Sequence, residues 1–91
     1  MPYSEMAMDV APETGITEAA TADELCKVGL AYCTGVGVDA DMVAAHKWFN
    51  LAMLKGSEEA KEYRQQMADL LSSDEIKQAL KSARDWLNLM N

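Results

Sequence analysis

The chain has 91 residues, of which 49% are hydrophobic and 25% charged, so it can form one small domain with a modest core. Its net charge of -7, with no cluster of Lys or Arg, argues against nucleic acids and anionic membranes as partners. No apolar run approaches the roughly 18 residues of a membrane helix, and the first residues lack the pattern of a signal peptide, so we expect a cytoplasmic protein.

The opening of the chain differs in charge from the rest. Residues 1–24 carry six acids and no base, whereas the following residues carry nine acids and eight bases. Pro2, Pro12 and Gly15 favour an irregular backbone. We therefore expect residues 1–21 to be an acidic, mostly irregular segment and residues 22–91 to be the folded domain. Four apolar residues leave open whether the segment packs on that domain: Met6, Met8, Val10 and Ile16.

A first helix should begin at Ala22, since the apolar residues from here follow helical spacing. Its predicted inward face is Ala22, Leu25, Val28, Gly29 and Tyr32. The stretch 34–38 should end it, because two glycines in three residues provide a flexible turn. A second helix should begin near residues 39–41, where a carboxylate can cap free N–H groups, and run to residue 55, with a left-handed stop at residue 56. The inward face predicted for it is Met42, Ala45, Trp48, Phe49 and Ala52.

Two more helices follow. The third should begin at Ser57, and its apolar stripe is Ala60, Tyr63, Met67, Leu70 and Leu71. The fourth should follow Ser72, whose spacing to Glu75 matches a capping box. Its predicted inward face is Ile76, Ala79, Leu80, Ala83, Leu87 and Met90. The sequence thus predicts an all-α fold of four helices.

One pattern between residues 28 and 60 is more specific than helical spacing. It reads V-G-x-x-Y-x-x-G-x-G-V-x-x-D and then A-x-x-W-F-x-x-A-x-x-x-G-x-x-x-A. This closely resembles the Sel-one-like repeat, a relative of the tetratricopeptide repeat. The residues that carry the resemblance are Gly29, Tyr32, Gly35, Gly37, Trp48, Phe49, Ala52, Gly56 and Ala60. His46 departs from it, because family members usually have a small residue there.

The resemblance implies antiparallel helix hairpins stacked as a short α-solenoid, with an adaptor or scaffold role. Residues 22–56 would form one full repeat, and residues 57–91 a partial repeat and C-terminal cap. Gly29 costs about 1 kcal/mol in helix propensity, so we expect Trp48 and Phe49 of the second helix to approach it closely. Tyr32 should bury its ring in the hairpin and find a hydroxyl partner near the turn at 34–38.

A protein or peptide is the expected partner, and a homo-oligomer is possible. The groove of such a repeat would be lined by exposed positions of the first and third helices, here Lys27, Leu30, Arg64 and Met67. Arg64 could pair with a carboxylate of an incoming peptide or of the acidic opening segment. Trp86 and Leu89 lie off the inward face of the fourth helix, so we expect them to meet a second copy or another protein. The alternative that residues 1–20 cover them stays open.

The thiols and the histidine raise a different function. Cys26 and Cys33 lie seven residues apart, about 10 Å along a helix, which is too far for a disulfide. An enzyme or redox protein using Cys33 with His46 is the alternative to an adaptor, but no third group orients that pair. Two Cys and one His also fall short of a closed four-ligand zinc site. We therefore expect no catalytic residue, no metal and no cofactor.

Overall fold

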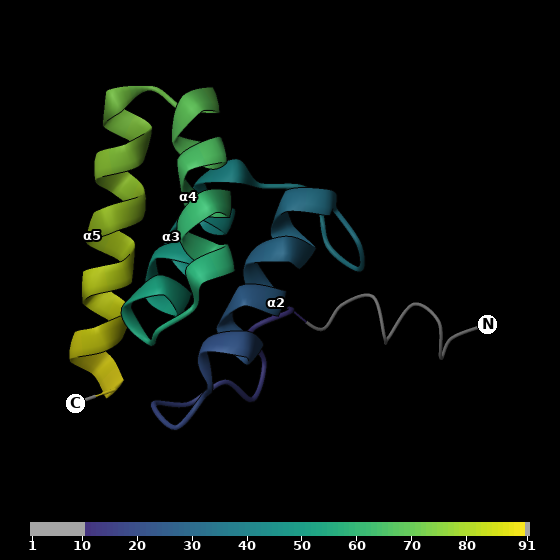
Figure 1. Cartoon of the computed structure of the whole chain (residues 1–91), viewed down its shortest axis with the longest axis vertical. Coiled ribbons are helices and arrows are strands. Elements are labelled where there is room, and N and C mark those ends of the chain that lie inside the picture. The colour runs from purple at the N-terminus through teal and green to yellow at the C-terminus, as the bar shows by residue number, and fades with distance from the viewer. Residues whose placement is uncertain (1–10, 91) are drawn as a thin grey trace.

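The computed structural model describes residues 11–90, and this part of the chain forms four helices and no strand (Figure 1). Residues 1–10, including Met6, Met8 and Val10, lie outside the described residues, as does the side chain of Met90. The prediction of an all-helical fold with four helices is confirmed. Their bounds are Ala22–Thr34 (α2), Met42–Leu54 (α3), Glu58–Leu70 (α4) and Ser73–Met90 (α5).

Local capping sets where the helices begin. The Asp41 side chain accepts a hydrogen bond from the backbone N–H of Ala44 in α3. The Ser57 side chain accepts one from the backbone N–H of Ala60 in α4. The predicted capping box at α5 is present, with Ser72 and Glu75 bonded to each other's backbone N–H at 3.1 and 2.9 Å. An equivalent box at α2, built by Thr21, was not predicted. Each cap satisfies backbone donors that the first helical turn leaves free.

Helix α3 lies at the centre, and α2, α4 and α5 pack mainly on it rather than on one another. Its sequence explains this position, because Lys47 is its only charged residue and a helix that is apolar nearly all round is buried. Three α3 residues that were not predicted to face inward are also buried: His46, Asn50 and Leu51. The mostly apolar composition of residues 42–54 is the signal that could have found them.

Gly29 brings α2 and α3 into close contact through one aromatic ring. A Cβ added at Gly29 would lie 2.5 Å from Cδ1 of Phe49, and the three nearest atoms all belong to that ring. The expectation is confirmed for Phe49 and wrong for Trp48. Trp48 instead packs edge-on against Trp86 of α5, with ring centroids 5.5 Å apart. Neighbouring residues of a helix point about 100° apart, so two consecutive rings do not face the same glycine.

Two leucines predicted to face inward are exposed instead. Leu70 of α4 is 71% exposed and Leu80 of α5 is 41% exposed. The reason is that α4 and α5 each cover α3 with a narrow stripe, formed in α5 by Ala79 and Ala83, and few contacts join the two helices to each other. Figure 1 shows α4 and α5 running antiparallel from a short link, with α5 extending beyond α4.

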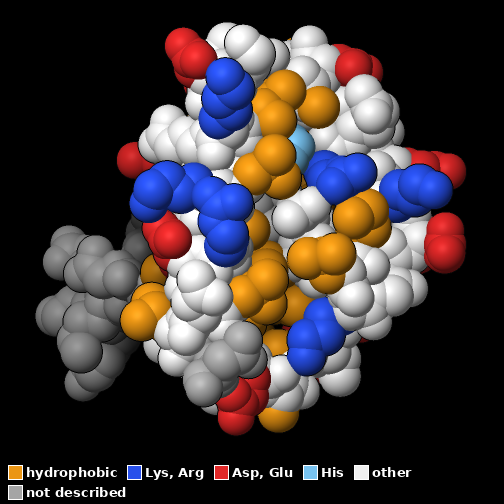
Figure 2. Space-filling view, turned by 90° about the vertical axis from the view of Figure 1, so that its left-hand side faces the viewer, with side chains coloured by type: hydrophobic (Ala, Val, Ile, Leu, Met, Phe, Trp, Pro, Cys, Tyr) orange, Lys and Arg blue, Asp and Glu red, His pale blue; other side chains and the backbone are white. Residues whose placement is uncertain are grey.

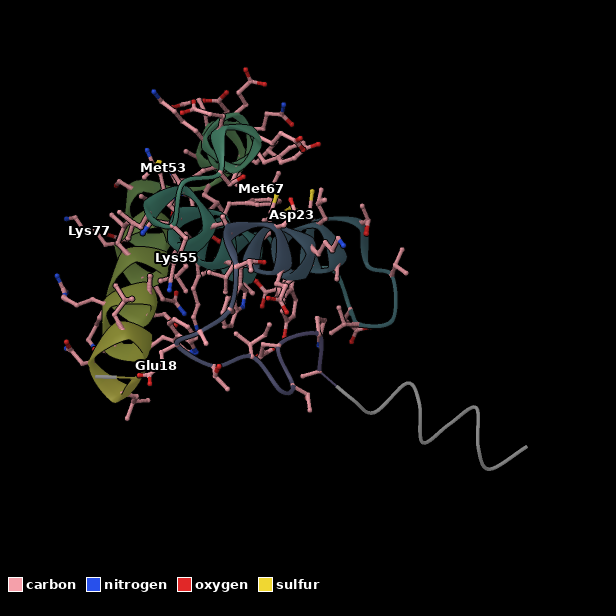
Figure 3. The ribbon with its side chains drawn as sticks, turned by 60° about the horizontal axis from the view of Figure 1, so that its bottom comes forward. Glu18, Asp23, Met53, Lys55, Met67 and Lys77 are labelled. Carbon is pink, nitrogen blue, oxygen red and sulfur yellow. The ribbon has the colours of Figure 1, made fainter. Side chains whose placement is uncertain are left out.

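Residues 11–20 form turns that pack on the helices. The Tyr32 hydroxyl donates to Oε1 of Glu13 at 2.6 Å, and Nζ of Lys55 donates to the backbone oxygen of Glu18 at 2.7 Å. Ala20 is buried beside them. The expected hydroxyl partner of Tyr32 comes from the acidic opening segment, and Pro12, next to Glu13, borders the same hollow as Val36 and Gly37 of the turn. Figure 3 shows Lys55 on the side of the molecule where Glu18 lies.

Candidate interaction surface

The four residues expected to line a groove do not form one surface. Lys27 is exposed on α2 and borders a hollow with Ile16, whereas Arg64 borders a separate hollow on α4. Leu30 is half-buried. Met67 is 4% exposed, so the expectation that it is exposed is wrong. Its position on the inward stripe of α4 places it in the core.

Arg64 has a partner inside the molecule. Its guanidinium donates to Oδ1 of Asn50 in α3 at 2.7 Å. The described part of the opening segment, residues 11–20, bonds to Tyr32 and Lys55 instead. Pairing of Arg64 with that segment is thus not seen among residues 11–90, and the guanidinium links α4 to α3.

Trp86 and Leu89 have different surroundings. Trp86 is half-buried on Trp48 and lines an apolar cavity of about 160 Å³ with Leu25 and Leu51. Trp86 therefore packs on α3. The sequence had led us to expect contact with a second copy or another protein, or cover by residues 1–20. Leu89 is 81% exposed, in line with its position off the inward face.

His46 is buried and lacks a hydrogen-bond partner at one ring atom. It is 3% exposed, and within residues 11–90 nothing bonds to its Nδ1. Burial, and then the positive charge of Arg64, lower the pKa of His46 below its ordinary value. The ring is consequently neutral near pH 7. His46 thus places a neutral ring in the interior beside Arg64 of α4.

The cysteines show no arrangement for catalysis. Both are free, with Cys26 buried and Cys33 partly buried. Burial raises the pKa of the Cys26 thiol, and Ser57 at the start of α4 hydrogen bonds to it, which opposes the rise. Among the described residues no hydrogen bond joins Cys33 to His46, and no group of three or more His, Cys, Asp or Glu could hold a metal ion. The Cys33 and His46 pair gains no support from these contacts.

A surface that the sequence reading missed lies where α4 and α5 separate. We call it the apolar strip and define it by Met53 of α3 with Ile76, Leu80 and Leu87 of α5. All four side chains are partly or largely exposed. Figure 3 shows Met53 between α4 and α5, and Figure 2 shows apolar side chains gathered along this side of the molecule.

Basic residues border the apolar strip on both sides. Lys77, Lys81 and Arg84 follow Ile76, Leu80 and Ala83 by one position each, so they share one edge of α5. Lys61 and Arg64 lie three residues apart on α4, on the side where Arg64 reaches Asn50. In Figure 2 Lys and Arg side chains stand on either side of the apolar side chains, and Asp and Glu side chains lie toward the rim.

Comparison with known proteins adds no identity to this surface. No family model, curated protein or solved structure matches this chain. Within residues 11–90 no helix combines the length and the apolar character needed to cross a bilayer. The apolar strip combines exposed apolar side chains with basic residues on both of its edges.

Proposed function

We propose that this protein is a protein-interaction module, built on a helix pair of the Sel-one-like type and serving as an adaptor or scaffold. The observation that carries the proposal is the exposure of large apolar side chains on well-formed helices. Four leucines hold 41 to 81% of their surface in water: Leu54, Leu70, Leu80 and Leu89. Large exposed apolar side chains on a folded domain mark sites where proteins bind, and of these leucines Leu80 belongs to the apolar strip whereas Leu70 lies away from it.

Three further features support the repeat assignment. The contact of Gly29 with the Phe49 ring explains why a helix-weakening glycine stands in the middle of α2. Gly35 and Gly37, both with positive φ, form the turn that returns the chain to α3. Tyr32, Trp48, Ala52 and Ala60 lie at or near the contacts of α3 with its neighbours. The partner in this proposal is a protein or peptide, and a second copy of the chain is the other candidate.

Cross-linking of the tagged full chain in cells of its source, followed by mass spectrometry, identifies candidate partners. Each candidate is then purified and mixed with the purified chain, and binding is measured by calorimetry. The proposal predicts at least one complex of fixed stoichiometry. It is overturned if no purified candidate binds and the chain alone stays monomeric in sedimentation.

The same experiment contains a control for the alternative function. Cys33→Ser changes a partly buried thiol and leaves the exposed leucines intact, so complex formation should be unchanged. Loss of a chemical activity of the wild-type chain in folded Cys33→Ser, with no partner found, would favour the thiol-based enzyme instead.

A further inference from the structure

The positive charge of this acidic protein is concentrated at one place. The whole chain has a net charge of -7, yet five of its eight basic residues are on α4 and α5, beside the apolar strip. These are Lys61, Arg64, Lys77, Lys81 and Arg84. The opening segment and α2 contribute only Lys27. Helices α4 and α5 also carry seven acids, so the positive potential is confined to the edges of the apolar strip, where Figure 2 shows Lys and Arg side chains with Asp and Glu side chains farther out.

Close ion pairs hold few of these basic side chains within residues 11–90, although Lys61 and Arg64 border the same hollow as Glu58, Glu59 and Glu62. Within residues 11–90 the one ion pair is between Lys81 and Asp85, at 2.8 Å, and both of these side chains are largely exposed. An exposed ion pair between neighbouring helical turns contributes little to stability, so an incoming carboxylate can compete for Lys81. Lys61, Lys77 and Arg84 have no carboxylate within 4.0 Å in this part of the chain. Their charges are available to a partner.

The apolar strip lies between these basic residues and follows one face of α5. Ile76, Leu80 and Leu87 repeat along α5 at helical spacing, and Met53 lies beside them at the end of α3. Methionine is unbranched and adapts to differently shaped apolar side chains. A partner helix lying along the strip would place its own apolar stripe on these residues. Its two polar edges would then meet the basic residues of α4 and α5.

We infer that the apolar strip binds an amphipathic helix whose apolar face is bordered on both sides by Asp or Glu. This inference rests on the proposed function and names the chemistry of the partner. Complementary charge on two edges fixes how the helix lies and speeds its encounter, while the apolar contact supplies most of the affinity. Lysine-edged helices are repelled by the same surface.

The probe is a fluorescein-labelled synthetic peptide of 18 residues, with leucine at helical spacing and glutamate on both flanks, and its binding is measured by fluorescence anisotropy. A matched peptide carries lysine in place of glutamate. The acidic peptide should bind at least 10-fold more tightly, and its affinity should fall as salt rises from about 25 to 300 mM, because salt screens exposed charges. Equal affinity for the two peptides, or no binding of the acidic one, overturns the inference.

Variants of the chain locate the binding surface. Lys77→Glu and Leu80→Ser should each weaken binding of the acidic peptide by about 5-fold or more, since both side chains are exposed and lie in or beside the apolar strip. Lys27→Glu and Leu70→Ser are the matched controls, because they make the same changes at exposed positions away from it. Circular dichroism verifies that all four fold. Equal effects of the strip variants and the controls overturn the inference.

The outcome is separable from that of the proposed function. A purified cellular partner that binds Lys77→Glu and Leu80→Ser as well as the wild type leaves the interaction module standing and removes the strip from it. Self-association through the strip, seen by sedimentation and not displaced by the acidic peptide, makes a second copy the occupant and overturns the inference. Methyl NMR of labelled methionines gives an independent readout, since the signal of Met53 should shift on binding and that of buried Met67 should not.

Discussion

At the scale of single residues, His46 combines burial with an unused polar atom. Its Nδ1 has no hydrogen-bond partner within residues 11–90, and the nearby Arg64 adds an unfavourable positive charge whenever the ring is protonated. A buried polar atom without a partner costs about 1 to 3 kcal/mol. His46 therefore reduces stability at the centre of the fold, and it does so more strongly in acid.

The pH dependence follows from the direction of the shift. The pKa of His46 is lowered in the folded protein from about 6.5, so folding stability is fully present above pH 6.5 and falls as the pH drops below that value. His46→Leu should remove this loss and be neutral or stabilising by up to about 1 kcal/mol at pH 7.5. Urea unfolding between pH 7.5 and 5.5 measures both effects. The chain has one histidine, so equal pH slopes in the two proteins would contradict the expectation.

At the scale of the helices, the contact of α2 with α3 depends on the missing side chain at Gly29. Gly29→Ala should gain about 1 kcal/mol in helix propensity and lose about 1 to 3 kcal/mol through overpacking against the Phe49 ring. The ring has little room to move, because Phe49 is fully buried and lies 5.2 Å from the ring of Tyr63. We expect a net loss of up to about 2 kcal/mol in the free energy of unfolding, measured by thermal or urea unfolding.

The matched experiment is the same change with a smaller side chain at residue 49. When Gly29→Ala is made in the Phe49→Leu background, the added methyl group should lower the free energy of unfolding by less than it does in the wild type. A double-mutant cycle should then give a coupling energy of at least about 0.5 kcal/mol. Additive effects of the two changes would show that the glycine serves the backbone of α2 rather than the approach of α3.

The helices and their ends could be predicted because their causes are local. Asp41, Ser57 and Ser72 cap the helices that were expected to follow them, and Gly35 ends α2 with a left-handed conformation. Side-chain spacing also indicated the contact between Gly29 and Phe49. These features depend on neighbours within a few residues or on one helix pair.

The surface could not be predicted with the same success, because it depends on how α4 and α5 sit relative to α3. Leu80 was expected to face inward and is exposed, whereas Met67 was expected both on the apolar stripe of α4 and in the groove, and it is buried. Helical spacing identifies an apolar face without saying how much of it a neighbour covers. The positions of Lys77, Lys81 and Arg84 along one edge of α5 were a usable signal, which gains meaning only once the exposed leucine beside them is known.

Across the protein as a whole, two hydrogen bonds join the acidic opening segment to the helical domain. One links Lys55 to Glu18, 37 residues away in sequence, and the other links Tyr32 to Glu13, 19 residues away. The Tyr32 hydroxyl of the second hydrogen bond is a titratable group. Burial, and then the hydrogen bond to Glu13, raise the pKa of Tyr32 to about 12. The raised pKa favours the neutral hydroxyl in the folded protein, so its contribution to stability is present below about pH 10 and is lost as the pH rises toward 12.

Tyr32→Phe should therefore lower the free energy of unfolding by about 1 kcal/mol at neutral pH. Between pH 10 and 11.5 the variant should lose less stability than the wild type, because it has no hydroxyl to ionise at residue 32. It should also speed proteolysis within residues 11–20, because one of the two ties is removed. Tyr63→Phe is the matched control, since its hydroxyl makes no hydrogen bond in the described part of the chain. Equal proteolysis of the two variants would show that Glu13 does not hold the segment.

The central position of α3 has a consequence for how this protein tolerates change over generations. A substitution in α2, α4 or α5 alters chiefly one interface, whereas a substitution in α3 alters up to three at once. Amino-acid replacements should therefore accumulate on the outer helices and be rare in residues 42–54. The outer helices, which carry Leu70, Leu80, Leu89 and most of the basic residues, are thus free to acquire new binding preferences while α3 preserves the architecture.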